Sequence, residues 1–68
     1  MTTHHFKNSS MFTNGNYDAD KHELTIHFSS GKVYHYVDVD KDIWHSLTTA
    51  ESAGKYFNSI KAGLKQKV

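Results

Sequence analysis

The sequence predicts one small α+β domain, in which a three-stranded antiparallel β-meander is followed by two α-helices packed on one face. Two observations support this fold class. Apolar and polar residues alternate on both sides of a turn at Ser30 and Gly31, which is typical of a β-hairpin. In the last third of the chain, apolar residues recur three and four positions apart, as they do along one face of a helix.

Size and composition limit the classes of protein to consider. The chain has 68 residues and no cysteine, so it is a marginal domain without disulfides, and we expect a homo-oligomer. A signal-peptide pattern and an apolar stretch of about 20 residues are both missing, so we expect a soluble, cytoplasmic protein without a membrane partner. All eight basic residues are lysines, which disfavours sequence-specific reading of nucleic acid.

The first quarter of the chain predicts a loose end and then a strand. Residues 1–8 are polar, and we expect them to be loose; His4 and His5 lack the further ligands that a metal site needs. Residues 9–17 predict the first strand, which Asn14-Gly15-Asn16 interrupts in the manner of a β-bulge. The aspartates and lysine that follow predict a solvated turn.

The second and third strands form the predicted hairpin. Leu24 and Ile26 alternate with polar residues, and residues 32–37 are rich in β-branched and aromatic side chains. A three-residue turn closed by Gly31 places Tyr34 and Tyr36 on the face of Ile26 and Leu24, whereas a two-residue turn would place the other side of that strand there. We favour the first register, because large amphipathic rings suit the floor of a small core.

The favoured register leaves His27 and His35 together on the outer face of the sheet. This face is either an ordinary solvated surface or a metal-binding or pH-sensitive interface.

Two helices follow. Asp40 predicts an N-cap for a helix over residues 41–47, with Leu47 facing the core and Trp44 at its edge. Thr49 or Ser52 caps the last helix, whose apolar stripe consists of Phe57, Ile60 and Leu64. We expect residues 65–68 to fray.

Gly54 lies in the first turn of that last helix, where glycine costs about 1 kcal/mol relative to alanine. Close approach of another backbone or close approach of a ligand would each offset this cost.

The ordered set of these residues resembles the KTSC domain, a short module named for the C-terminus of some lysyl-tRNA synthetases. The resemblance rests on Tyr34-His35-Tyr36, on Ser52-x-Gly54 followed by Tyr56-Phe57-Asn58, and on Ser9-Ser10. The sequence departs from the family pattern at Asp40, where a proline is usual. The position on a synthetase implies RNA binding for the family.

We therefore expect a binding module rather than an enzyme, with no cofactor and no metal. Ser52, Gly54 and Lys55 supply a hydroxyl, bare N–H groups and a cation at a helix start, which suits a phosphate. The predicted ligand-binding residues are Ser52, Gly54, Lys55, Tyr34, Tyr36, Tyr56, Asn58 and Lys61.

Two phosphate-bearing ligands compete for this predicted site. Single-stranded RNA would follow the lysine-rich C-terminal segment with Lys55, Lys61, Lys65 and Lys67, and would use the tyrosines for stacking. A small nucleotide would sit in a closed pocket and be sequestered there, as viral counter-defence proteins do by stoichiometric binding. The alternative function is a protein–protein or self-assembly module that uses the outer sheet face and needs no small ligand.

Overall fold

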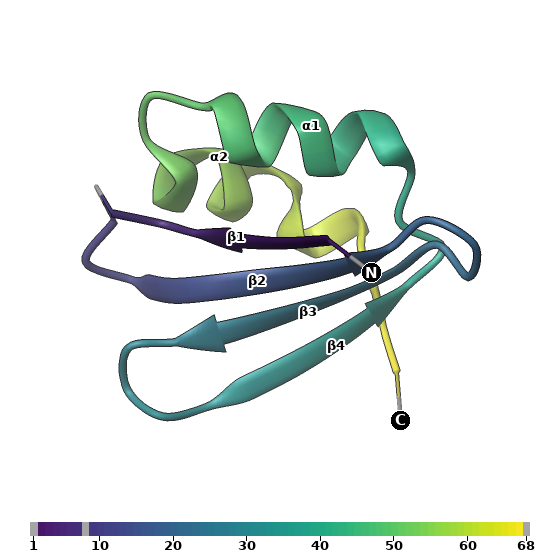
Figure 1. The fold of residues 1–68 in the computed structure, drawn as a ribbon, viewed down its shortest axis with the longest axis horizontal. Coiled ribbons are helices and arrows are strands. Elements are labelled where there is room, and N and C mark those ends of the chain that lie inside the picture. Colours follow the sequence, from purple (N-terminus) through teal and green to yellow (C-terminus); the bar gives the residue numbers. More distant parts are fainter. Residues whose placement is uncertain (1, 8, 68) are drawn as a thin grey trace.

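The computed structural model describes residues 2–7 and 9–67, and it shows an antiparallel sheet with two helices on one face (Figure 1). The predicted α+β class and both helices are confirmed, but the sheet has five strands instead of three, in the order β1-β2-β3-β4-β5. The elements are β1 (Thr2–His5), β2 (Phe12–Asp18), β3 (Glu23–Phe28), β4 (Val33–Val37), α1 (Lys41–Thr49), α2 (Ala53–Ile60), the short 3-10 helix η1 (Lys61–Gly63) and β5 (Lys65–Gln66).

The first additional strand comes from the N-terminal segment that we expected to be loose. β1 pairs antiparallel with β2, from Thr2 opposite Tyr17 to His5 opposite Asn14. Phe6 follows directly and is buried, with its ring centroid 5.3 Å from that of Phe12. The segment is thus held by one buried ring and a strand partner, which its polar sequence does not reveal. Residues 1 and 8 of this prediction lie outside the described part of the chain.

The second additional strand comes from the tail that we expected to fray. Lys65 and Gln66 pair with β4, and the N–H of Lys67 donates to the carbonyl of His35 at 2.8 Å. Leu64 packs against the core just before this strand, so the chain is directed to the edge of the sheet. A two-residue strand carries no periodic pattern, and residue 68 lies outside the described residues.

The predicted register of the central hairpin is confirmed. Leu24 lies opposite Tyr36 and Ile26 opposite Tyr34, while Gly31 has the positive φ of 96° that the turn requires. The inner face of the sheet therefore carries the tyrosines. The β-bulge falls earlier than predicted, because the shift in pairing with β3 lies between Phe12 and Asn14.

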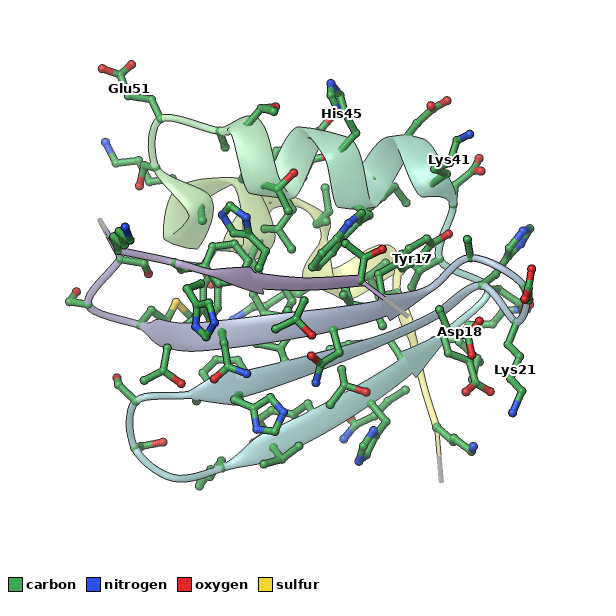
Figure 2. The ribbon with its side chains drawn as sticks, in the orientation of Figure 1. Tyr17, Asp18, Lys21, Lys41, His45 and Glu51 are labelled. Atoms are coloured by element: carbon green, nitrogen blue, oxygen red, sulfur yellow. The ribbon has the colours of Figure 1, made fainter. Side chains whose placement is uncertain are left out.

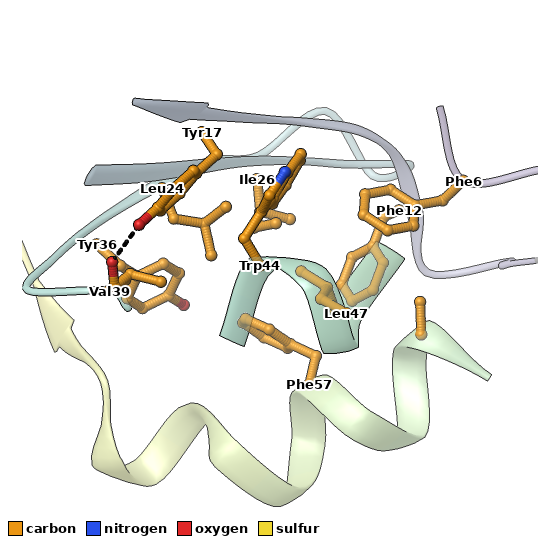
Figure 3. Close-up of a cluster of buried hydrophobic side chains, with 11 residues drawn as sticks. Phe6, Phe12, Tyr17, Leu24, Ile26, Tyr36, Val39, Trp44, Leu47 and Phe57 are labelled. Carbon is orange, nitrogen blue, oxygen red and sulfur yellow. Dashed lines mark hydrogen bonds between the residues drawn. The ribbon is translucent and has the colours of Figure 1, made fainter. Parts of the chain in front are cut away.

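The helices bury their apolar side chains against this inner face (Figure 3). Phe57 of α2 lies among Phe12, Phe28 and Tyr36, with ring centroids 5.3, 5.9 and 5.8 Å away. Trp44 of α1 stacks on Tyr17 at 5.6 Å, as expected for a residue at the core edge. The core is thus a continuous set of aromatic contacts between the two layers.

Gly15 explains how the helix layer approaches β2 so closely. A methyl group at this position would lie 3.1 Å from the Phe6 ring, 3.3 Å from Ile26 and 3.3 Å from the Trp44 ring. Each of these distances is tighter than ordinary van der Waals contact. Glycine therefore makes room for the two aromatic rings, a role that the sequence interpretation as a bulge missed.

Candidate functional site

The start of α2 presents the backbone donors that the sequence predicted. Ser52 is the N-cap, and its Oγ accepts a long hydrogen bond from the N–H of Lys55 at 3.5 Å. The N–H of Tyr56 makes the first intrahelical bond, to the carbonyl of Ser52 at 3.1 Å. This leaves the N–H groups of Ala53 and Gly54 as the donors of the helix end, in a first turn, residues 53–56, that has no acidic side chain.

Packing does not account for Gly54. A methyl group there would lie 3.6 Å from Sδ of Met11 and 3.9 Å from Oγ of Ser9, which are ordinary contacts. These neighbours are side-chain atoms of the loop between β1 and β2, so the prediction of a closely approaching backbone is wrong. Gly54 is also only half-buried. The other explanation, access for a ligand, stays a prediction.

The loop between β1 and β2 adds Ser9 to the site. Its Oγ accepts hydrogen bonds from the N–H groups of Met11, at 3.1 Å, and Phe12, at 3.3 Å. This tight turn fixes the serine hydroxyl against the start of α2. The sequence places Ser9 at the start of the predicted first strand and in the family resemblance but does not indicate it as a site residue, because only tertiary contact joins it to Gly54.

An open hollow of about 90 Å³ lies beside this helix start, below the connection from α1 to α2. Small-molecule pockets usually measure about 300–1,000 Å³, so this hollow is too small to enclose a whole nucleotide. Its cation is Lys7 and its carboxylate is Glu51, whose side chain extends outward in Figure 2. The lining residues are His4, Phe6, Lys7, Ser9, Leu47, Thr48, Ala50, Glu51 and Ala53.

The predicted tyrosines lie in the core instead of at the helix start. The Tyr36 ring packs on Phe57, and burial raises the pKa of Tyr36, with Tyr34 raising it further. Tyr34 is half-buried, and its ring lies 5.1 Å from that of Phe28. Stacking of a base on Tyr36 would require the core to open, so the Tyr36 ring is not accessible as a stacking platform in this fold.

The remaining predicted residues spread along α2 and do not converge. Lys55 is exposed in the first turn, and Tyr56 is half-buried. Asn58 is exposed further along, and Lys61 begins η1 at the opposite end of the helix. Eight helical residues span about 12 Å, so Lys61 is a full helix length from the site.

The proposed lysine track is interrupted at the C-terminus. Lys65 lies 3.5 Å from Asp38 and Lys67 lies 3.6 Å from Glu23, measured between charged atoms. These exposed pairs contribute little stability, but each places a negative charge beside a lysine. Of the four lysines in this segment, Lys55 and Lys61 on α2 and η1 remain as candidates for contact with a phosphate chain.

Residues 2–7 and 9–67 contain no group of three or more histidine, cysteine or acidic side chains placed to hold a metal ion. Neither α1 nor α2, the α-helices in that part of the chain, has the length and apolar character of a membrane span.

Comparison with known proteins relates this chain to a family model, to a protein sequence and to a solved structure. The model of the KTSC domain family matches residues 8–62. An uncharacterized protein of Stutzerimonas stutzeri (strain A1501) is 36% identical over 44 residues, which cover 65% of this chain and 62% of that protein. The crystal structure of a KTSC domain protein from Yersinia pestis has a TM-score of 0.88 and 25% identity, and the match covers 97% of this chain and 93% of that one. The chain therefore belongs to the KTSC domain family.

Proposed function

We propose that this chain is a non-catalytic binding module that holds a phosphate-bearing ligand, RNA or a small nucleotide, by its phosphate at the start of α2. One observation carries the proposal: the start of α2, where the backbone N–H groups of Ala53 and Gly54 lack intrahelical partners, adjoins an open hollow of about 90 Å³ that Ala53 lines. Lys7 lines that hollow, and Lys55 lies in the same first turn of α2.

The size of the hollow also bears on which part of the ligand is recognised. A phosphate fits inside, whereas a base or sugar would rest on the surrounding surface. For RNA, Lys55 and Lys61 would contact the backbone further along α2. Together with the phosphate beside Lys7, these make three phosphate contacts, which on a single strand give a salt dependence with a slope of about −2.1.

The test is a nuclear magnetic resonance titration of the purified protein with inorganic phosphate, with adenosine monophosphate and with a short single-stranded RNA. We expect the amide signals of Ala53, Gly54 and Lys55 to shift with all three, most strongly with the ligand whose remaining groups also make contact. The Lys7→Ala and Lys55→Ala variants should each bind several-fold more weakly. Lys41→Ala, at the exposed start of α1, is the matched control and should bind like the parent.

Gly54→Ala separates ligand access from packing. Because the added methyl group makes only ordinary contacts, we expect the variant to fold and to gain up to about 1 kcal/mol of stability from helix propensity. We nevertheless expect binding to weaken, because the added methyl group takes up space at the first turn of α2, beside Met11 and Ser9. Equal binding by the parent, Gly54→Ala and Lys55→Ala would show that the ligand does not bind here.

A further inference from the structure

The edge of β4 that faces away from β3 is only partly covered by β5. β4 comprises Val33–Val37, whereas β5 pairs with Tyr36 and Val37 alone. The N–H of Lys67, directly after β5, donates to the carbonyl of His35 at 2.8 Å. In the part of the chain that the structure describes, no strand pairs with this edge of β4 beyond His35.

The backbone groups of Val33 point to the uncovered part of this edge. Lys32 is bonded to β3, because its carbonyl accepts a hydrogen bond from the N–H of Phe28 at 2.8 Å. Successive residues of a strand direct their backbone groups to opposite sides, so the N–H and carbonyl of Val33 point away from β3. The Val33 side chain is also 44% exposed. A donor, an acceptor and an apolar side chain are thus available here to a further strand.

Few interactions hold β5 in place. Lys65, Gln66 and Lys67 are all exposed. The ion pairs of Lys65 with Asp38, at 3.5 Å, and of Lys67 with Glu23, at 3.6 Å, lie on the surface, where such pairs contribute little stability. A short segment with so few buried contacts opens at low cost in free energy. A longer strand of the same chemistry can replace β5 and gain further backbone hydrogen bonds.

We propose that this edge of β4 is a docking site for an extended basic peptide of a partner protein, which adds to the sheet in place of β5. β5 and the residue after it indicate what the peptide presents: lysines at alternate positions, beside Asp38 and Glu23. Opposite the half-buried Tyr34 an apolar residue fits, and opposite Val33 a β-branched one. The pattern, antiparallel to β4, is therefore Lys-x-Lys-apolar-β-branched.

Other occupants fit this edge less well. A second copy of the chain would offer the same Lys65-Gln66-Lys67, which already lies in place at a high effective concentration. Nucleic acid would meet the carboxylates of Asp38 and Glu23. The hollow beside α2 is lined by residues of β1 and its following loop, at the other edge of the sheet, so this inference is independent of the proposed ligand.

Fluorescence anisotropy of the full chain with a labelled and capped peptide, Lys-Gln-Lys-Ile-Val, tests the proposal. We expect saturable binding, together with slower hydrogen exchange of the Val33 amide, which gains an acceptor in the complex. The charge-reversed Glu-Gln-Glu-Ile-Val should bind at least about tenfold more weakly, because it meets Asp38 and Glu23 with like charge. The shortened Lys-Gln-Lys should also bind about tenfold more weakly, because it leaves Val33 unpaired.

Two variants of the chain distinguish the cover from the edge beneath it. Lys65→Glu places two acids side by side, loosens β5 and should bind the peptide several-fold more tightly. His45→Glu adds a carboxylate on the exposed side of α1, where His45 extends away from the sheet (Figure 2), and should bind like the parent. Val33→Pro removes the edge donor but no hydrogen bond to β3, and should bind at least about tenfold more weakly.

Circular dichroism identifies which variants are folded, and the shortened peptide decides the result if Val33→Pro is not. The proposal is overturned if neither the parent nor Lys65→Glu binds Lys-Gln-Lys-Ile-Val, or if the charge-reversed peptide binds equally well. Binding without slower exchange at Val33 would place the peptide elsewhere and overturn it too. Self-association of the parent in sedimentation equilibrium that Val33→Pro removes would assign the edge to a second copy instead.

Discussion

The two faces of this sheet consist of the same strands, yet their side chains make different kinds of contact. On the inner face, aromatic rings from β2, β3, β4 and both helices pack together, and Phe12, Leu24, Ile26 and Phe57 are almost completely buried. On the outer face, threonine, asparagine and histidine side chains bond laterally to their cross-strand neighbours. The comparison indicates that the fold depends on the inner face for most of its stability, while the side chains of the outer face are exposed or only half-buried.

The largest effect that this comparison predicts is at Phe57. Phe57→Ala removes the ring that joins α2 to three aromatic residues of the sheet, and we expect a loss of about 3–5 kcal/mol in the free energy of unfolding. His35→Ala on the exposed outer face is the control, with an expected loss below about 1 kcal/mol. Urea denaturation of both variants measures the difference. Comparable losses would mean that the two faces contribute equally to stability.

A smaller effect is expected at Gly15, where the inner face has no room for a side chain. Gly15→Ala places a methyl group 3.1 Å from the Phe6 ring and 3.3 Å from the Trp44 ring, and we expect a loss of about 1–3 kcal/mol. Gly63→Ala is the matched control, because a methyl group there meets nothing within 4 Å. In thermal unfolding, we expect a lower Tm for Gly15→Ala and an unchanged Tm for Gly63→Ala. An unchanged Tm for Gly15→Ala would show that Phe6 and Trp44 move apart at little cost.

The smallest predicted effect concerns ionisation on the inner face. Burial raises the pKa of Tyr17 above 10.0, and Asp40 and Asp18 raise it further; burial also raises the pKa of Tyr36. The unfolded chain therefore releases these protons at lower pH than the folded chain does. The associated stability is fully present below pH 10.0 and is lost as pH rises from there through the folded-state pKa values.

Tyr17→Phe tests this alkaline loss. At about pH 8 the variant should lose about 1–2 kcal/mol, because the carbonyl of Val39 loses the 2.7 Å hydrogen bond from the tyrosine hydroxyl (Figure 3). Between about pH 8 and about pH 11, however, the variant should lose less additional stability than the parent. Urea denaturation at both pH values provides the comparison. An equal alkaline loss would assign the effect to groups other than Tyr17.

Secondary structure could be predicted from the sequence where a residue pattern repeats or a capping residue is present. Alternation in β3 and β4, the turn at Gly31 and the capping residues Asp40 and Ser52 each indicate local structure, and together they predicted the hairpin register and both helices. β1 and β5 could not be predicted in this way. They are four and two residues long, almost entirely polar, and held by strand partners and by the neighbouring apolar residues Phe6 and Leu64.

The candidate site was predictable only in part, for a similar reason. Ser52, Gly54 and Lys55 lie within four positions of one another, so the sequence alone indicates a helix start there. Lys7 and Ser9 reach the same place through the path of β1 and its loop, which requires the fold to be known. The tyrosine strand was assigned to the correct face, but its rings pack under Phe57 instead of reaching the helix start, a distinction that depends on how α2 lies on the sheet.

The short strand β5 has a consequence for the behaviour of this chain at high concentration. β4 is rich in β-branched and aromatic residues, and such a strand with an open edge invites pairing with other chains and aggregation. β5 occupies that edge with two residues; its own Lys65 forms an ion pair with Asp38, and Lys67 directly after it forms one with Glu23. Lys65 and Gln66 thus cover the β4 edge, and truncation before Lys65 would expose that edge and favour intermolecular sheet formation.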